Sequence, residues 1–483
     1  MAFDLSPFVD RRRRFAETIG DSLAIVPGAR EALRNADTHF EFRQDSDFFF
    51  LTGFDEPDAV AVINPGHAKE RFVLFVRPRD REMEVWNGRR AGVEGAVARY
   101  GADAAYPAEE LDAKLREYAV DRAVIVYRLG NPLHDSRVTR LISEMRIARA
   151  RGLVAPARID DPGPILHELR LRRSPEELAR QRRACQISRD AHIEAMRYAR
   201  PGQHEYEVQA ALEFVFKKGG SPRNAYPSIV ASGPNATILH YSENTRRMED
   251  GDLLLIDAGC EWGYHAADIT RTFPVNGRFT PPQRRIYEVV LRAQQAAIDA
   301  ARPGARYEAM HEAARRALVE GLVDLKLLPR GVEDSLAMHH YREFYMHGTG
   351  HWLGMDVHDV GDYRVRRQSR VLEPGMVLTV EPGLYFDPEH ESVTYRLREY
   401  SEEEAWERRA RLGAAAAKKI EDGEKARAEA VEHPVPSEYQ GISVRIEDDL
   451  LITEGGAEIL TAGTPKTVED VERTCAEAPR LPR

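Results

Sequence analysis

Short apolar runs alternate with amphipathic stretches over the first 150 residues. Runs of β-branched, aromatic and small apolar residues cover 59–63, 72–76 and 123–127, as is typical of buried strands. Residues 108–118 place Leu111, Leu115 and Tyr118 on one helical face. The pattern predicts a self-contained unit of alternating strands and helices.

A change of pattern near residue 165 predicts a domain boundary. Residues 160–164 (DDPGP) are loop-forming, and Ser174-Pro175-Glu176-Glu177 has the residues of a helix capping box. We therefore expect an amino-terminal domain over 1–168 and a second domain over 169–483. The second domain should mix strand pairs with long helices, expected at 174–199, 280–301 and 305–321.

One segment departs from this pattern, at about 389–438. It is rich in Glu, Arg, Lys and Ala and has little apolar periodicity, which predicts a solvated helical insertion. Because it offers little apolar surface, we expect the core not to depend on it.

Composition restricts the function classes. The 483 residues are 42% hydrophobic and 31% charged, as in soluble proteins with a sizeable core, and no apolar stretch is long enough to span a membrane. The net charge, 69 − 79 = −10, disfavours nucleic acid as a partner. Three scattered cysteines and no apolar signal core predict a cytoplasmic protein without disulfides.

Several catalytic motifs are missing from the sequence. It contains no H-E-x-x-H, no phosphate-binding P-loop, no G-x-G-x-x-G after a strand and no G-x-S-x-G. Zincin proteases, P-loop enzymes, dinucleotide enzymes and serine hydrolases are therefore disfavoured.

Four carboxylates interrupt or close apolar strand patterns. They are Asp257, Asp268, Glu381 and Glu447. A buried carboxylate without a compensating charge costs several kcal/mol, so four in one domain predict a shared positive charge. Arg271 and Arg445 are too few to neutralise all four, whereas two divalent metal ions would balance them.

Histidines near these acids complete a candidate metal set. His347, His351 and His358 fall within twelve residues of one another, and His240 lies upstream. Oxygen ligands with one imidazole favour manganese first, with cobalt, iron or zinc as substitutes. Two such ions suit hydrolysis.

The motifs around these residues resemble those of the pita-bread metallopeptidases, and aminopeptidase P of the bacterial type in particular. The resemblance rests on FRQDSDFFFLTGFDEPDAV and VWNGRR in the first domain, and on LLLIDAGCEWGYHAADITRTFPV, FYMHGTGHWLGMDVHDVG, LEPGMVLTVEPGLY and GISVRIEDD in the second. It implies an α/β fold: a mixed amino-terminal domain like that of creatinase, followed by a pita-bread catalytic domain. The interval between the last two motifs is longer than in the family.

The resemblance also implies roles. Asp257 would bind one metal, His351 the other together with Glu381, and Asp268 and Glu447 would bridge both. Glu381 would also carry a proton to the leaving nitrogen. The residues implied to contact substrate or support the ligands are His240, His347, His358, Tyr385, Arg445 and Trp86, the last reaching a neighbouring subunit of a homodimer or homotetramer.

Three functions remain open at this point. The first is release of the N-terminal residue from peptides with proline second, and the second is a prolidase that cleaves Xaa-Pro dipeptides with the same ligands. The third is a non-catalytic binding module of the same fold. The presence of all five ligands disfavours this module, and it also disfavours a metal-free amidinohydrolase of the same fold.

Overall fold

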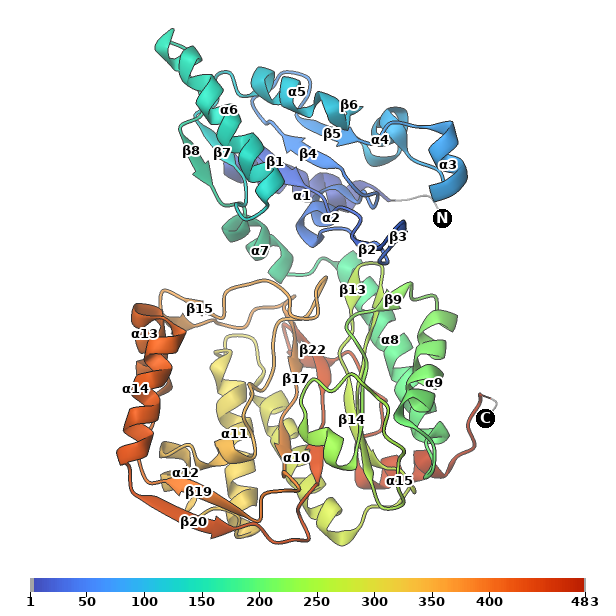
Figure 1. The fold of residues 1–483 in the computed structure, drawn as a ribbon, viewed down its shortest axis with the longest axis vertical. Coiled ribbons are helices and arrows are strands. Elements are labelled where there is room, and N and C mark those ends of the chain that lie inside the picture. The colour runs from blue at the N-terminus through green and yellow to red at the C-terminus, as the bar shows by residue number, and fades with distance from the viewer. Residues whose placement is uncertain (1–3, 482–483) are drawn as a thin grey trace. The chain divides into compact units, whose positions relative to one another are not determined.

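The computed structural model describes residues 4–481, apart from the side chains of 402 and 403 (Figure 1). The chain divides into two compact units, the first ending at Arg170 and the second beginning at Leu171. Over the described residues, no helix is long and apolar enough to cross a membrane.

The first unit is built on a six-stranded mixed sheet with the order β6-β5-β4-β1-β7-β8. Its strands are β1 (Leu23–Pro27), β4 (Val60–Ile63), β5 (Phe72–Val76), β6 (Ala104–Pro107), β7 (Val124–Val126) and β8 (Arg158–Asp160). A small hairpin joins β2 (Leu33–Asn35) to β3 (Thr38–His39). The helices are α1 (Ser6–Ile19), α2 (Ser46–Thr52), α3 (Arg81–Asn87), α4 (Gly92–Tyr100), α5 (Leu111–Tyr118), α6 (Pro132–Ala150) and α7 (Gly163–Leu171). The three predicted strands are confirmed as β4, β5 and β7.

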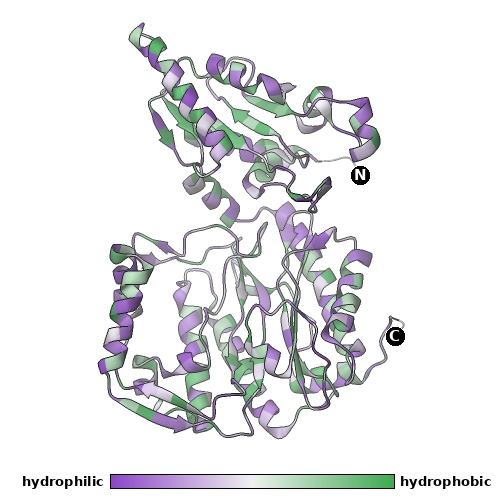
Figure 2. Cartoon of the chain, in the orientation of Figure 1, coloured by the Kyte–Doolittle hydropathy of each residue, from purple (hydrophilic) through white to green (hydrophobic). Residues whose placement is uncertain are grey.

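The helices of the second unit agree with the predicted pattern. The hydroxyl of Ser174 accepts from the Glu177 amide and the Glu177 side chain accepts from the Ser174 amide, so the predicted capping box starts α8. The helices are α8 (Pro175–Tyr198), α9 (Glu205–Lys218), α10 (Pro281–Ala300), α11 (Glu308–Asp324), α12 (Val332–Ala337) and α15 (Val468–Ala476). Their apolar faces form the largest core cluster together with the strands (Figure 2).

Short antiparallel sheets fill the centre of the second unit. Their strands are β9 (Arg223–Asn224), β10 (Ile229–Ser232), β11 (Leu253–Asp257), β12 (Cys260–Trp262), β13 (His265–Ala266), β14 (Thr270–Pro274), β17 (Val377–Val380), β18 (Gly383–Tyr385), β21 (Ser443–Arg445), β22 (Asp448–Thr453) and β23 (Gly456–Ile459). β11 pairs with β10 and β14, β17 with β22, and β18 with β21. A further hairpin joins β15 (Arg364–Val365) to β16 (Gln368–Ser369).

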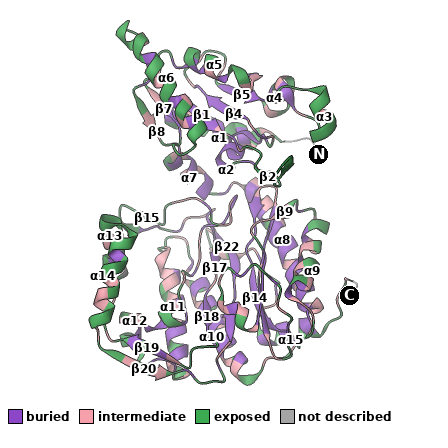
Figure 3. Ribbon diagram, in the orientation of Figure 1, coloured by how far each residue is buried: buried purple, intermediate pink, exposed green. Residues whose placement is uncertain are grey.

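The segment predicted as a solvated helical insertion has two parts. Its outer part is a pair of largely exposed helices, α13 (Glu402–Leu412) and α14 (Ala414–Arg427), as predicted (Figure 3). Its base is an antiparallel arm of β19 (Ser392–Arg396) and β20 (Ala430–Pro434).

The expectation that the core does not depend on this segment is wrong for the arm. Val393 and Tyr395 of β19 are buried in the largest core cluster, and the Tyr395 hydroxyl donates to the Leu327 carbonyl at 2.7 Å. The alternation of β19, buried at every second position, is short and lies beside a long charged stretch. The charged composition of the whole segment is therefore the reason that β19 was not predicted.

Candidate metal centre

The four predicted carboxylates converge because the ends of their strands meet. Asp257 ends β11, Asp268 precedes β14, and Glu381 follows β17. Glu447 lies between β21 and β22. Its amide donates to the Thr270 carbonyl of β14 at 3.0 Å, and this bond links the β21–β22 segment to the β11–β14 pair. Short strands thus deliver side chains from distant parts of the sequence to one place.

These side chains line a cavity of about 550 Å³ in the second unit. Of the eleven residues implied to bind metal, to contact substrate or to support the ligands, nine line it: His240, Asp257, Asp268, His347, His351, His358, Glu381, Arg445 and Glu447. The exceptions are Tyr385, which lies buried behind His347, and Trp86, which is 83% exposed on α3 of the first unit.

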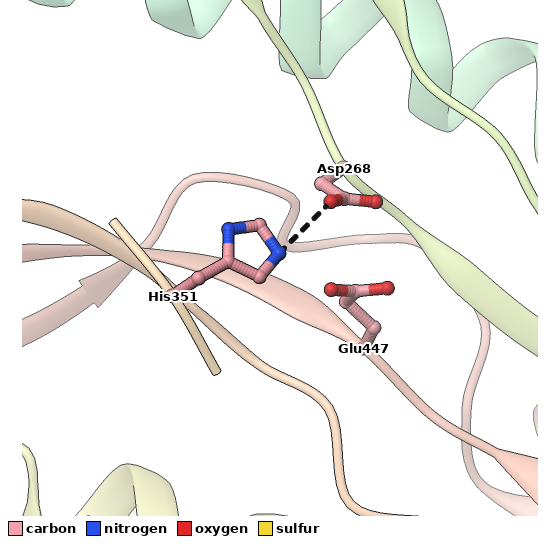
Figure 4. Close-up of side chains that lie close together, drawn as sticks. All are labelled: Asp268, His351 and Glu447. Atoms are coloured by element: carbon pink, nitrogen blue, oxygen red, sulfur yellow. Dashed lines mark ion pairs between the residues drawn. The ribbon is translucent and has the colours of Figure 1, made fainter. Parts of the chain in front are cut away.

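Asp268, His351 and Glu447 form the tightest cluster (Figure 4). One ligand atom of each lies within 4.8 Å of the others, and Nε2 of His351 is 3.3 Å from Asp268 Oδ2. The opposite nitrogen, Nδ1, donates to the Trp352 carbonyl at 3.1 Å. This bond fixes the ring so that Nε2 faces the carboxylates, as metal-binding histidines require.

Burial and mutual repulsion make these acids hard to ionise. Burial, followed by the charges of neighbouring carboxylates, raises the pKa of Asp268 and Glu447. Burial raises the pKa of Glu381 to about 7, against the attraction of His351 and Arg445. Burial alone would lower the pKa of His351, but the Asp268 and Glu381 carboxylates raise it to about 9. The cavity is therefore short of positive charge.

Arg445 is the single arginine or lysine among the described residues that line the cavity. Its Nη2 donates to Asp257 Oδ2 at 2.5 Å, its Nη1 to the Tyr385 hydroxyl at 2.9 Å and its Nε to Thr270 Oγ1 at 3.2 Å. Arg271, the other candidate for neutralising the four acids, instead forms a buried ion pair with Asp448. One guanidinium cannot balance four carboxylates, so the need for further cations remains.

The other histidines surround the cluster. The Nδ1 of His347 donates to the Gly348 carbonyl at 2.7 Å, so its Nε2 accepts from the Tyr385 hydroxyl at 2.8 Å. Burial, and then the charge of Arg445, lower the pKa of His347 to about 3, so the ring is neutral. His358 stands edge-on to His351, with ring centroids 4.4 Å apart, and burial lowers its pKa. His240 is exposed where it lines the cavity.

Two residues that contact the acids were missed from the sequence. The Tyr226 hydroxyl lies 2.7 Å from Asp257 Oδ1 and also contacts Asp268, and Thr270 Oγ1 donates to Glu447 Oε2 at 2.6 Å. Thr270, the first residue of β14, lies two residues after Asp268, a spacing that could have identified it. Tyr226 lies in a loop before β10 and has no such signal.

Comparisons with known proteins agree with this arrangement. Residues 179–454 match metallopeptidase family M24, and residues 8–127 match the N-terminal domain of aminopeptidase P. The chain is 40% identical to the Xaa-Pro aminopeptidase of Escherichia coli and 41% identical to that of Haemophilus influenzae, with 96% of each chain covered in both cases.

Solved structures give the same result for the fold. Aminopeptidase PepP of Pseudomonas aeruginosa superposes with a TM-score of 0.87 at 43% identity, covering 98% of both chains. Zinc-substituted E. coli aminopeptidase P in complex with product gives 0.86 at 40% identity, covering 98% of this chain and 99% of that one.

Proposed function

The chain belongs to metallopeptidase family M24 and is an Xaa-Pro aminopeptidase, and we propose that its central cavity holds two divalent metal ions. The expected fold class, a mixed α/β amino-terminal domain and a pita-bread catalytic domain, is confirmed. The relatives support the Xaa-Pro aminopeptidase reading over prolidase and over a non-catalytic module. We also propose that the amino-terminal domain spans 1–168 and the catalytic domain 169–483.

The donor set fits divalent metals. Asp257, Asp268, His351, Glu381 and Glu447 offer four carboxylates and one imidazole around one cavity, and burial raises the pKa of three of the acids. Cations of total charge +4 would remove this unfavourable charge. Oxygen-rich ligands favour Mn²⁺, with Co²⁺, Zn²⁺ or Fe²⁺ as substitutes.

When bound, the metals supply a nucleophile at neutral pH and polarise the peptide carbonyl. The protein positions the side chains that would hold the metals. The Trp352 carbonyl orients His351, and Arg445 and Tyr226 hold Asp257. Glu381, beside the cluster, carries a proton on a carboxylate oxygen to the leaving proline nitrogen.

The remaining histidines act on the substrate. Burial and the charge of Arg445 keep His347 neutral, and His358 and His240 line the same cavity. An imidazole N–H of His358 or His240 can donate to the oxygen that becomes negative as the carbonyl is attacked, whereas the N–H of His347 is already bonded to the Gly348 carbonyl. Tyr385, through His347 and Arg445, supports the wall beside the expected proline position.

We further propose that the enzyme acts in the cytoplasm as a homodimer or homotetramer. The exposed Trp86 is suited to contact a neighbouring subunit, because a large exposed aromatic side chain favours burial at an interface. Proline-containing peptides are the expected partners, and neither nucleic acid nor membrane is expected.

Peptide assays test the proposed activity. The purified enzyme with Mn²⁺ should release arginine from Arg-Pro-Pro, leave Arg-Ala-Pro intact and act poorly on the dipeptide Ala-Pro. Chelation should abolish the reaction and Mn²⁺ should restore it, as measured by chromatography of the products. Efficient cleavage of Ala-Pro alone would instead identify a prolidase, and saturation below one metal ion per chain would contradict the dinuclear site.

Replacing His358 or His240 with alanine should reduce turnover but spare metal binding. Each variant loses an imidazole that is proposed to contact the substrate and not the metal. The expected reduction is large because an oxyanion donor is worth about 10²–10³-fold in rate. Metal content per chain and kcat should be measured on the same samples. Loss of manganese from either variant would show that the histidine is a ligand.

A further inference from the structure

An arginine-rich hollow is lined by residues of α13 and of the β15–β16 hairpin. It has a volume of about 280 Å³. Its lining residues are Arg342, Arg364, Arg367, Tyr400, Ala405, Trp406, Glu407 and Arg409. Four arginines and one glutamate thus surround it, in a chain whose net charge is −10.

Three of these arginines form ion pairs with glutamates. Arg364 pairs with Glu308 and Arg367 with Glu407, both at 3.6 Å, which is beyond hydrogen-bonding distance. Arg409 pairs with Glu421 at 3.3 Å. The side chains of the Arg364–Glu308 and Arg367–Glu407 pairs are 41–76% exposed, so these two ion pairs are weak and an incoming carboxylate can compete for their arginines.

Aromatic surface accompanies the charge. Trp406 on α13 is 55% exposed where it lines the hollow, and the Arg342 guanidinium stacks over the Tyr400 ring at 5.1 Å. An exposed tryptophan beside arginines offers a peptide apolar contact as well as charge. The hollow therefore has the chemistry of a site for an acidic peptide segment.

A second cavity shares lining residues with both this hollow and the catalytic cavity. It has a volume of about 310 Å³ and shares Arg342 and Arg364 with the hollow. It shares His347, Gly348 and Gly350 with the metal cavity. Three neighbouring cavities thus run from the metal ligands to α13, on the side of His347.

We propose that this hollow binds a carboxylate in the part of a peptide substrate that lies downstream of the proline. This rests on the proposed function, because the cavity chain begins at His347, where the proline is expected. The carboxylate is either an acidic side chain or the peptide's own C-terminus. The inserted helices thereby act in substrate selection.

Peptide series of fixed length test the position and source of the carboxylate. Amidated octapeptides that begin Ala-Pro carry one Asp, or Asn as the matched control, at each position from the third to the seventh. Acid-terminated and amidated peptides of three to seven residues examine the C-terminal carboxylate separately. We expect kcat/KM to favour the carboxylate by about three- to tenfold at one or two positions, through KM, and this preference to weaken with added NaCl.

Variants assign the effect to the hollow. Arg367→Gln combined with Arg409→Gln should remove the preference, as should replacing residues 398–428 with a short glycine-containing turn that keeps the β19–β20 arm. Arg411→Gln, on α13 but outside the lining, should retain it. All should cleave amidated Ala-Pro-Ala at the parent rate.

The outcomes separate this inference from the proposed function. A parent enzyme that cleaves Ala-Pro-Ala but treats Asp and Asn peptides alike overturns the inference alone. The same holds if the Arg367→Gln/Arg409→Gln variant keeps the preference. Failure to cleave any Xaa-Pro peptide overturns the proposed function instead.

Discussion

Asp268→Asn is expected to lose manganese and to reduce kcat/KM by about a thousandfold or more, since metal activation is worth several kcal/mol. Asp268 lies in the tightest ligand cluster, 3.3 Å from His351. The metal-free variant should nevertheless melt at a higher temperature than the metal-free parent. The raised pKa of buried Asp268 means that its ionised form destabilises the fold near pH 7, and asparagine removes that charge.

Asp257→Asn is the matched control for this experiment. Its carboxylate is the ionic partner of Arg445, so its removal leaves that buried guanidinium without this partner, while the cluster of Asp268, His351 and Glu447 stays complete. It should retain more metal and more activity than Asp268→Asn. Metal analysis, thermal melts with and without Mn²⁺, and kcat/KM decide the comparison. An Asp268→Asn enzyme with full metal content would contradict the proposed ligand role.

Arg271→Met is expected to destabilise the second unit by about 3 kcal/mol, because Asp448 loses its buried guanidinium partner and keeps only Lys466 as a cationic partner. Arg271 and Asp448 are both about 1% exposed and lie 2.7 Å apart. Arg271 also donates to the carbonyls of Glu447, Thr270 and Pro465. These acceptors would lose a buried donor.

An exposed arginine provides the control for this stability measurement. Arg284 pairs with Glu288 and Glu469 on the surface, so Arg284→Met should change the free energy of unfolding far less than Arg271→Met does. Urea unfolding followed by tryptophan fluorescence measures both variants. Equal shifts would show that the buried pair has no special role.

The sequence predicted the elements that have local signals. The capping box at Ser174 and the apolar runs of β4, β5 and β7 depend only on neighbouring residues, and they are where the pattern placed them. The carboxylates were also accessible, since an acid at the end of an apolar strand needs a partner wherever the strand lies.

The different contacts of the three adjacent acids could not be derived from the hydrophobic pattern of the sequence. Glu447, Asp448 and Asp449 are consecutive and all buried, yet only Glu447 faces the metal cavity. Asp448 contacts Arg271, and Asp449 accepts from the Asp268 amide and from Cys185 Sγ. Successive side chains of a strand point to opposite faces, but which face is which depends on tertiary packing. The strand pattern singled out Glu447 as the acid that closes the apolar run 442–446, but it assigned no roles to Asp448 and Asp449.

The paired arm beneath the inserted helices has a consequence for engineering. Arg396 and Ala430 are cross-strand partners, so the chain leaves and re-enters the catalytic unit at nearly the same point. Whatever lies beyond that point is tethered by two adjacent strands and imposes little strain on the framework. The arm is therefore a suitable insertion site for a foreign domain whose termini lie close together, such as a fluorescent reporter or an affinity tag.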